Sequence, residues 1–156
     1  MRITLITALL AISSSICSQV YVYPDQFFNY LDMLYNIENG VLCEGNRNLW
    51  ADAIMTVEGT NIYEGYSTSG FDVMFSYRDG HLYLQDSQFS SDILYTYKKG
   101  KIYRGDSEFL LDLMFTVTND GVYEGNSTQI FDRLFTFQGR PTPAELFAIM
   151  IAMGYL

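Results

Sequence analysis

Short apolar segments follow one another along the chain at a constant interval of 20 residues. Each segment begins at an aspartate and is about six residues long, as in residues 112–117 (DLMFTV). The segments are rich in β-branched and aromatic side chains, which is typical of strands, and they are too short for helices. The aspartates that open them are Asp32, Asp52, Asp72, Asp92, Asp112 and Asp132.

A turn and a second apolar segment complete each unit. The turn pairs glycine with a preceding residue such as Asn39 or Asp79, and these pairs accept the positive φ of tight hairpin turns. Polar and apolar residues then alternate, as in residues 101–105 (KIYRG), which predicts a half-buried strand. Each unit is therefore predicted to form a β-hairpin. The loop that follows carries a serine at one repeated position: Ser67, Ser87, Ser107 and Ser127.

The repeats predict an all-β fold in one hairpin-repeat domain, residues 19–140. Equivalent aspartates two strands apart lie about 10 Å from each other, near one Debye length, so solvent relieves their repulsion. We expect the hairpins to form an open, curved, solenoid-like meander, because both ends of the array look like caps. A closed β-barrel is the alternative. Residues 20–24 (VYVYP) are expected to pair as an edge strand.

The C-terminal segment, residues 141–156, is predicted to be a capping helix. Thr142 and Glu145 match a capping box, with Pro143 at the first helical position. Residues 146–153 (LFAIMIAM) are apolar on every face, which is typical of a buried helix. We expect the helix to cover the last strand or the mouth of the sheet. It is also the candidate surface for a homo-oligomer.

Residues 1–18 are typical of a signal peptide. A positive residue precedes an apolar run at residues 3–12, and small polar residues follow. Cleavage is expected near Cys17 or Ser18, and Ile16 before the cysteine argues against a lipoprotein. The apolar run is shorter than the roughly 20 residues of a membrane span. The protein is therefore expected to be exported, to the periplasm or the extracellular space.

Composition excludes several classes of function. The 156 residues include 18 acidic and 9 basic side chains, a net charge of -9, which disfavours nucleic acid as a partner. One histidine and two cysteines offer neither a metal cage nor a catalytic triad, and no cofactor is expected. The repeated aspartates and serines are expected to cap local backbone groups, since calcium needs six to eight oxygen ligands. Cys43 is expected to be a small buried side chain.

Aromatic residues recur at two positions of the repeat, and each row is a candidate for core or for surface. The candidate ligand-binding row is Tyr63, Tyr83, Tyr103 and Tyr123, with Cys43 in the same position of the first unit. If these rings are exposed, they form a strip that stacks against sugar rings or grips a partner. The other row is Tyr35, Met55, Phe75, Tyr95, Phe115 and Phe135. A rival core row on the same strands is Leu34, Ile54, Met74, Leu94, Met114 and Leu134.

We therefore expect a non-enzymatic binding module that uses one face of the repeat array. Linear arrays suit extended ligands, such as a glycan or a protein chain. A structural protein that self-associates through the apolar helix is the alternative. An enzyme is the third hypothesis, and it would require a metal or cofactor that the sequence does not indicate.

Three resemblances support hairpin repeats. GVYEGNS (residues 121–127) and NIYEGYS (residues 61–67) resemble the Tyr-Glu-Gly core of MORN repeats, which are tandem β-hairpins, although MORN units are a few residues longer. The repeat length is similar to that of choline-binding cell-wall repeats, but those are rich in tryptophan and this chain has only Trp50. The pattern over residues 32–138 also looks like that of small exported bacterial repeat proteins. None of these resemblances implies an activity.

Overall fold

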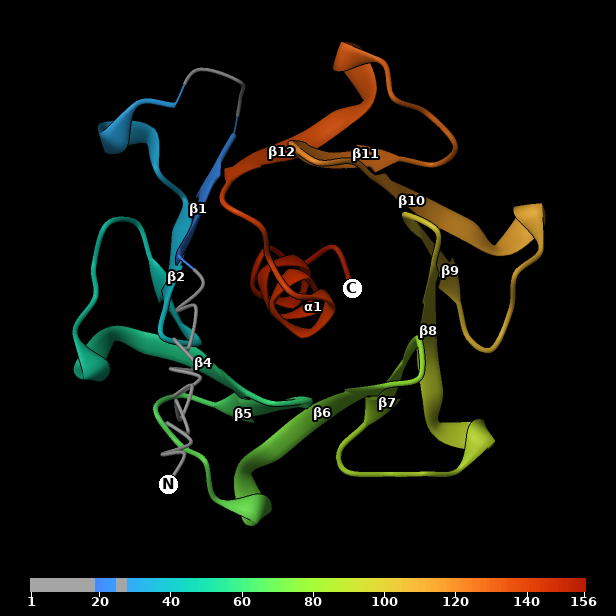
Figure 1. Ribbon diagram of the computed structural model, residues 1–156, viewed down its shortest axis with the longest axis horizontal. Coiled ribbons are helices and arrows are strands. Elements are labelled where there is room, and N and C mark those ends of the chain that lie inside the picture. The colour runs from blue at the N-terminus through green and yellow to red at the C-terminus, as the bar shows by residue number, and fades with distance from the viewer. Residues whose placement is uncertain (1–18, 25–27) are drawn as a thin grey trace, which may run out of the picture.

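The computed structural model describes residues 19–24 and 28–156, so the predicted signal peptide lies outside the described residues. Twelve antiparallel strands form a closed barrel around one α-helix, α1 (Pro143–Ala152), as Figure 1 shows. The strands are β1 (Gln19–Tyr23), β2 (Tyr35–Glu38), β3 (Val41–Glu44), β4 (Ala53–Glu58), β5 (Asn61–Glu64), β6 (Val73–Arg78), β7 (His81–Leu84), β8 (Ile93–Lys98), β9 (Lys101–Arg104), β10 (Leu113–Val117), β11 (Gly121–Glu124) and β12 (Arg133–Gln138).

Six short 3-10 turns lie at the outer corners of the barrel (Figure 1). Each of them ends at one of the repeated aspartates: η1 (Tyr30–Asp32), η2 (Trp50–Asp52), η3 (Gly70–Asp72), η4 (Ser90–Asp92), η5 (Leu110–Asp112) and η6 (Ile130–Asp132). We call the segment from the end of one hairpin to the next corner a petal loop. The petal loops are residues 45–52, 65–72, 85–92, 105–112 and 125–132.

Tight turns join the two strands of each hairpin, as the glycine-containing pairs predict. Asn39 and Asp79 take the positive φ values of 54° and 51°, and Gly40 follows at 77°. A Cβ atom at Gly40 would lie 2.3 Å from the backbone oxygen of Val57, so only glycine fits there. The hairpin repeats are therefore confirmed.

The barrel closes through β1, the segment that we expected at an edge. β1 pairs with β12, where Val22 lies opposite Phe137, and with β2, where Val20 lies opposite Ile37. The all-β repeat fold is confirmed, but the open meander is wrong and the closed alternative forms. The physical reason is that an open array leaves unpaired backbone groups along both end strands, and β1 satisfies both rows.

Helix α1 lies inside the barrel, along its axis (Figure 1). A barrel of about eight strands is filled by its own side chains, whereas a wider barrel leaves a lumen. The helix occupies that lumen, and sheet surrounds it on all sides, which explains why it is apolar all round. Its residues from Ala144 to Met150 are buried. The helix was expected over the last strand or the mouth of the sheet. Instead it lies within the barrel, so these residues present no surface for self-association.

The predicted capping box starts the helix. The Glu145 amide donates to Thr142 Oγ1 at 3.2 Å, and the Thr142 amide donates to Glu145 Oε2 at 2.7 Å. These two bonds satisfy backbone donors that have no partner within the helix. Farther along the chain, the Tyr35 hydroxyl donates to the Ala152 carbonyl at 3.1 Å and so ties the C-terminal end of α1 to β2.

The interior is lined by aliphatic side chains of the second strands and by the aromatic row of Tyr35, Met55, Phe75, Tyr95, Phe115 and Phe135. Phe135 is fully buried and Phe115 is 7% exposed, and both belong to the core that surrounds α1. On the helix, the Phe147 ring lies 5.7 Å from the Tyr77 ring and 6.5 Å from the Tyr97 ring, measured between centroids. The pKa values of the Tyr77 and Tyr97 hydroxyls are raised above the ordinary value, mainly because these groups are buried. This row is therefore part of the core.

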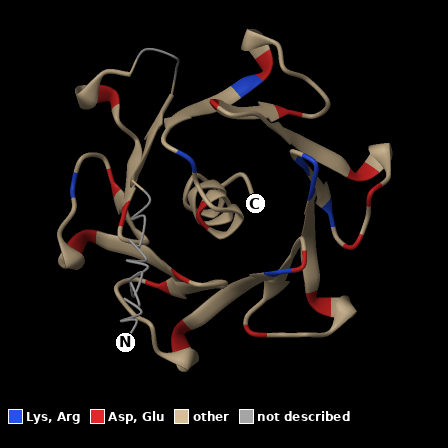
Figure 2. Ribbon diagram, viewed as in Figure 1, with Lys and Arg blue, Asp and Glu red and all other residues tan. Residues whose placement is uncertain are grey.

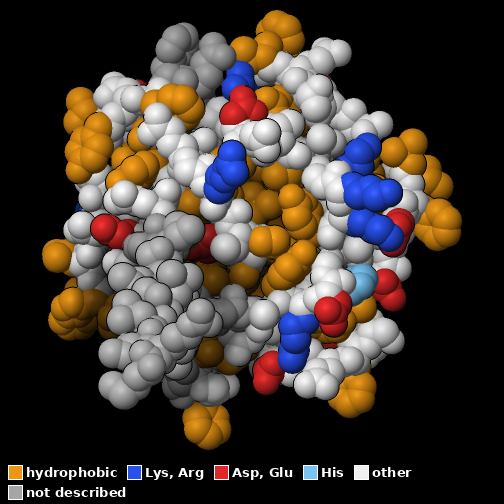
Figure 3. Space-filling model, viewed as in Figure 1, with side chains coloured by type: hydrophobic (Ala, Val, Ile, Leu, Met, Phe, Trp, Pro, Cys, Tyr) orange, Lys and Arg blue, Asp and Glu red, His pale blue; other side chains and the backbone are white. Residues whose placement is uncertain are grey.

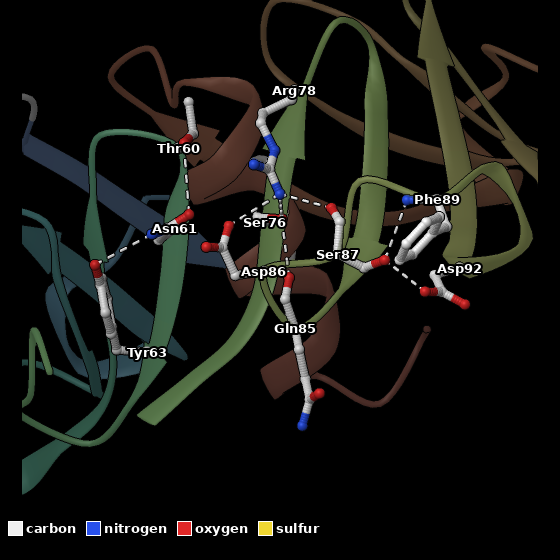
Figure 4. Close-up of polar contacts among 10 residues, drawn as sticks. All are labelled: Thr60, Asn61, Tyr63, Ser76, Arg78, Gln85, Asp86, Ser87, Phe89 and Asp92. Carbon is white, nitrogen blue, oxygen red and sulfur yellow. Dashed lines mark hydrogen bonds and ion pairs between the residues drawn. The ribbon is translucent and has the colours of Figure 1, made fainter. Parts of the chain in front are cut away.

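Two repeated hydrogen bonds hold four of the five petal loops against the barrel: residues 65–72, 85–92, 105–112 and 125–132. The loop 45–52 has Arg47 in place of the serine. At the start of the loop 105–112, Thr96 Oγ1 donates to the Gly105 carbonyl at 2.7 Å. At its end, Ser107 Oγ donates to Asp112 Oδ2 at 2.5 Å and accepts from the Phe109 amide at 3.1 Å. Figure 4 shows the same arrangement for Ser87 and Asp92, and Figure 2 shows acidic residues at the corners around the whole ring. The repeated aspartates with a serine partner therefore stabilise the loops.

Truncation of Phe147 tests the position of the helix. Phe147→Ala should lower the free energy of unfolding by about 3–5 kcal/mol, because it leaves a cavity in a fully packed interior. Guanidinium unfolding followed by circular dichroism measures this change. Phe71→Ala is the matched control, since Phe71 is 100% exposed, and its effect should stay within about 0.5 kcal/mol. Equal effects of the two variants would contradict a helix packed inside the barrel.

The serine–aspartate pair gives a second stability test. Ser107→Ala and Asp112→Ala should each cost about 1 kcal/mol of unfolding free energy, because each removes the bond that closes the loop. The double variant should lose less than the sum, since both changes remove the same interaction. Urea unfolding of the four proteins in this cycle provides the measurement. Strictly additive losses would show that the two side chains act independently.

Candidate binding site

The predicted ligand-binding tyrosines lie on the outer face of the barrel, in the grooves between consecutive petal loops. Tyr63 and Tyr123 are each 6% exposed, and Tyr83 and Tyr103 are half-buried. Of the two possibilities that the sequence left open for this row, core or exposed strip, the low exposure of these rings does not favour the strip. The reason is tertiary: the petal loops are bonded to the outer face of the sheet and cover the rows on which these rings lie.

Neighbouring side chains add to the packing of these tyrosines. Asn61 Nδ2 donates to the Tyr63 hydroxyl at 3.3 Å (Figure 4). The guanidinium of Arg78 lies 5.6 Å from the centroid of the Tyr83 ring, and a similar contact of 5.9 Å joins Arg133 to Tyr123. Such cation–π contacts stabilise the folded chain. The row therefore fills the outer grooves of the barrel.

The groove that lacks a tyrosine is open. In the first unit Cys43 stands at the tyrosine position, and two cavities of about 260 and 250 Å³ lie beside it on the outer face of β3. Both cavities are lined by Asn39, Val41 and Tyr66, so they form one continuous depression between the petal loops 45–52 and 65–72. A thiol is much smaller than a phenol ring, which explains the space. We call this depression the Trp50–Tyr66 groove.

Two exposed aromatic rings form the walls of the Trp50–Tyr66 groove. Trp50 comes from η2 and is 72% exposed, and Tyr66 comes from the next petal loop and is 64% exposed. Both rings line the same cavity. The residues that occupy the position of Tyr66 in other units are polar: Asn46, Asp86, Asp106 and Asn126. The two rings are thus specific to this groove and lie outside the core.

Polar side chains line the same groove. Asn36 is buried, and its Nδ2 donates to the carbonyls of Gly45 and Arg47 at 2.8 and 2.6 Å, which holds the first petal loop in place. Asn48 Nδ2 donates to Glu38 Oε2 at 3.4 Å. The groove therefore combines flat apolar walls with oriented hydrogen-bonding groups.

Ionic contacts join the end of the first strand to the petal loop in the third and fourth units. Arg78 Nη2 donates to the Ser87 carbonyl at 2.7 Å and lies 3.0 Å from Asp86 Oδ1 (Figure 4). In the fourth unit, Lys98 pairs with Glu108 of the petal loop 105–112. The second unit has Glu58 at this position, exposed and with no hydrogen-bond or ion-pair partner among the described residues. The loop 65–72 is therefore not tied to the end of β4, and the larger of the two cavities lies there.

Cys43 at the base of the groove is not suited to act as a nucleophile. Its side chain is 1% exposed, and its Sγ donates to the Leu49 carbonyl at 3.9 Å. Burial, and after it the charge of Asp52, raises the pKa of the thiol above its ordinary value. The thiol therefore stays protonated near neutral pH, whereas the reactive form is the thiolate.

A second exposed apolar surface consists of the corners of the barrel. Phe71, Leu111 and Phe131 are each more than nine-tenths exposed. Figure 3 shows hydrophobic side chains projecting from the rim of the molecule. We call this set the corner ring: Tyr30, Leu31, Trp50, Phe71, Phe89, Leu110, Leu111, Ile130 and Phe131. Between two neighbouring corners, Phe71 and Phe89 line a cavity of about 490 Å³.

Other candidate chemistry is accounted for by local contacts. Within residues 19–24 and 28–156, no group of three or more His, Cys, Asp and Glu side chains could hold a metal ion. His81 Nδ1 lies 3.0 Å from Thr96 Oγ1, and Lys101 pairs with Asn126. The described chain contains no helix that is both long and apolar enough to cross a membrane.

Sequence reasoning missed both the groove and the corner ring, because it followed the positions that repeat. The groove arises where the repeat is broken, at Cys43, Trp50 and Tyr66. The corner ring had a signal too: a large apolar residue stands directly before the aspartate at Leu31, Phe71, Leu111 and Phe131, in loops that begin with polar residues. Apolar residues in a predicted loop indicate a surface with a role beyond folding.

Comparison with known proteins agrees with this architecture. A family model described as "6-fold beta flower protein" matches residues 22–150. The match does not confirm the resemblance to MORN or cell-wall-binding repeats. No curated protein matches the chain. No solved structure matches it. The family match spans all six aspartate-initiated units and most of α1, and the chain therefore belongs to the 6-fold beta flower protein family.

Proposed function

We propose that the protein is an exported, non-enzymatic glycan-binding module, and that the Trp50–Tyr66 groove is its binding site. One observation carries the proposal: two exposed aromatic rings and several polar side chains line a single open depression that the fold itself does not require. Export is supported by the signal-peptide pattern of residues 1–18.

The chemistry of the groove suits a sugar chain. A sugar ring has an apolar face, which stacks on an aromatic side chain, and hydroxyl groups, which need hydrogen-bond partners. Trp50 and Tyr66 supply large rigid contact surfaces at low entropic cost. Asn48, Glu38 and Thr68 supply acceptors and donors along the same walls. Ligand sites in proteins commonly combine apolar walls with a few polar groups that set orientation.

The shape of the groove favours an extended ligand. The two cavities adjoin along β3 and remain open to solvent between two petal loops, so a chain can lie along them. The walls are held in advance by strand pairing and by the two hydrogen bonds of Asn36. A site that is already ordered loses less entropy when the ligand binds.

Aromatic truncation tests the site. Trp50 is the only tryptophan of the chain, so a change in its fluorescence on addition of chitin or cellulose oligosaccharides reports this groove alone. Trp50→Ala and Tyr66→Ala should each weaken binding about tenfold in calorimetric titrations, because each removes a stacking surface. Phe71→Ala removes a fully exposed ring outside the groove and should bind as the original protein does.

Two further controls make this test decisive. Cys43→Tyr restores the residue of the other units and should fill the groove, so binding is lost while the barrel keeps its stability. The recovered oligosaccharides should be unchanged in length, as expected for a non-enzymatic module. Full binding by Cys43→Tyr would exclude this groove as the site, and shortened oligosaccharides would show that the protein is an enzyme.

Self-association is a second candidate function, and the corner ring favours it. The buried residues of helix α1 cannot mediate it, but corner side chains such as Leu111 and Phe131 are free to contact another copy. The cavity between Phe71 and Phe89 is large enough to receive such a side chain. A contact between a corner and a cavity on different copies is heterologous, and it builds rings or open chains.

Sedimentation velocity tests this second candidate. If corners contact one another, the mean sedimentation coefficient should rise with protein concentration in the original chain. The double variant Phe71→Ser/Phe131→Ser should sediment as a monomer over the same range, since its corner ring is interrupted at two exposed positions. A monomer at all concentrations of the original chain would rule out self-association.

A further inference from the structure

The carboxylates of the Trp50–Tyr66 groove indicate which glycans it accepts. Glu38 lines one of the two cavities and Glu58 lines the other, and no lysine or arginine lines either of them. The nearby guanidinium of Arg47 lies 3.6 Å from Asp52 Oδ1 and is partly neutralised by it. The groove thus carries two negative charges without a facing cation, on a chain whose net charge is -9.

This pair of carboxylates is specific to the groove. The residues at the same repeat position in the third and fourth units are cations, Arg78 and Lys98, and each pairs with an acidic side chain of its own petal loop. In the first unit, by contrast, Glu38 accepts a bond from the neutral amide of Asn48 at 3.4 Å and has no cationic partner among the described residues. Glu58 has no hydrogen-bond or ion-pair partner within the described chain.

We infer that the groove selects glycans that carry free amino groups, and that Glu38 and Glu58 bind the ammonium groups while Trp50 and Tyr66 stack on the sugar rings. The inference rests on the proposed function and names the ligand class of the same site. An ammonium group gains charge-assisted hydrogen bonds from the carboxylates and a favourable contact with the aromatic faces. Uronic acids and sulfated sugars bring a negative charge next to two others and are repelled.

Titration with three glycans of equal length tests the inference: chitosan oligosaccharides with free amines, chitin oligosaccharides with acetylated amines, and oligogalacturonates with carboxylates. The titrations are run at a mildly acidic pH, at which the amines of chitosan are protonated and the ligand is cationic. Calorimetry should show that chitosan binds about tenfold more tightly than chitin and that oligogalacturonate does not bind. Added salt should reduce the preference.

One variant isolates the role of the charge. Glu58→Gln keeps the shape of the side chain and removes its charge, so it should weaken chitosan binding about three- to fivefold and leave chitin binding within about twofold. Glu124→Gln is the matched control, because Glu124 is an exposed glutamate at the end of β11 and lines neither cavity. It should change neither affinity.

The outcomes separate this inference from the proposed function. Equal binding of chitosan and chitin, together with no effect of Glu58→Gln, would overturn the amino-group selection and leave glycan binding intact. Chitosan binding that persists in Trp50→Ala and falls equally in Glu58→Gln and Glu124→Gln would reveal general attraction to an acidic protein, and it would overturn the inference. No binding of any of the three glycans would overturn the proposed function itself.

Discussion

The pairing of β1 with strands from both ends of the repeat array is the constraint on which the rest of the structure depends. Five hairpins and a lone strand would otherwise leave the backbone groups of β2 and β12 without partners. β1 comes from outside the aspartate-initiated units and supplies the missing strand. Once the ring is closed, the apolar rows of all twelve strands face one interior. That interior is stable only when other apolar side chains pack into it.

Helix α1 and the barrel stabilise each other. The helix is apolar on every face, so it is stable only where apolar side chains surround it, and the closed sheet provides that environment. The sheet in turn encloses more space than its own side chains fill. Phe147 shows the match, because one ring contacts the rings of Tyr77, Tyr95 and Tyr97 from two neighbouring hairpins. The buried helix is thus a core element that the chain adds last.

Regular positions of the repeat build the scaffold, and irregular positions create the candidate site. Tyr63 and its equivalents fill the outer grooves, and serine–aspartate bonds hold the loops beside them. At Cys43 no tyrosine ring fills the groove. At Glu58 the described residues form no ion pair like those that join Arg78 and Lys98 to their petal loops. Trp50 and Tyr66 then border the space that results. A binding site can therefore arise from a few substitutions, while the pairing of the twelve strands is kept.

The sequence by itself determined the local structure of this protein. The interval between aspartates, the turn pairs such as Asn39-Gly40 and the capping box at Thr142 predicted the hairpins and the helix correctly, because each depends on residues close together in the chain. Only the tertiary structure decided that the array closes, that the helix lies inside it and that Tyr63 is covered while Trp50 and Tyr66 share a groove. Closure depends on the pairing of Gln19–Tyr23 with a strand more than 100 residues away, and exposure depends on where the loops pack. Neither is encoded in the local pattern of polar and apolar residues.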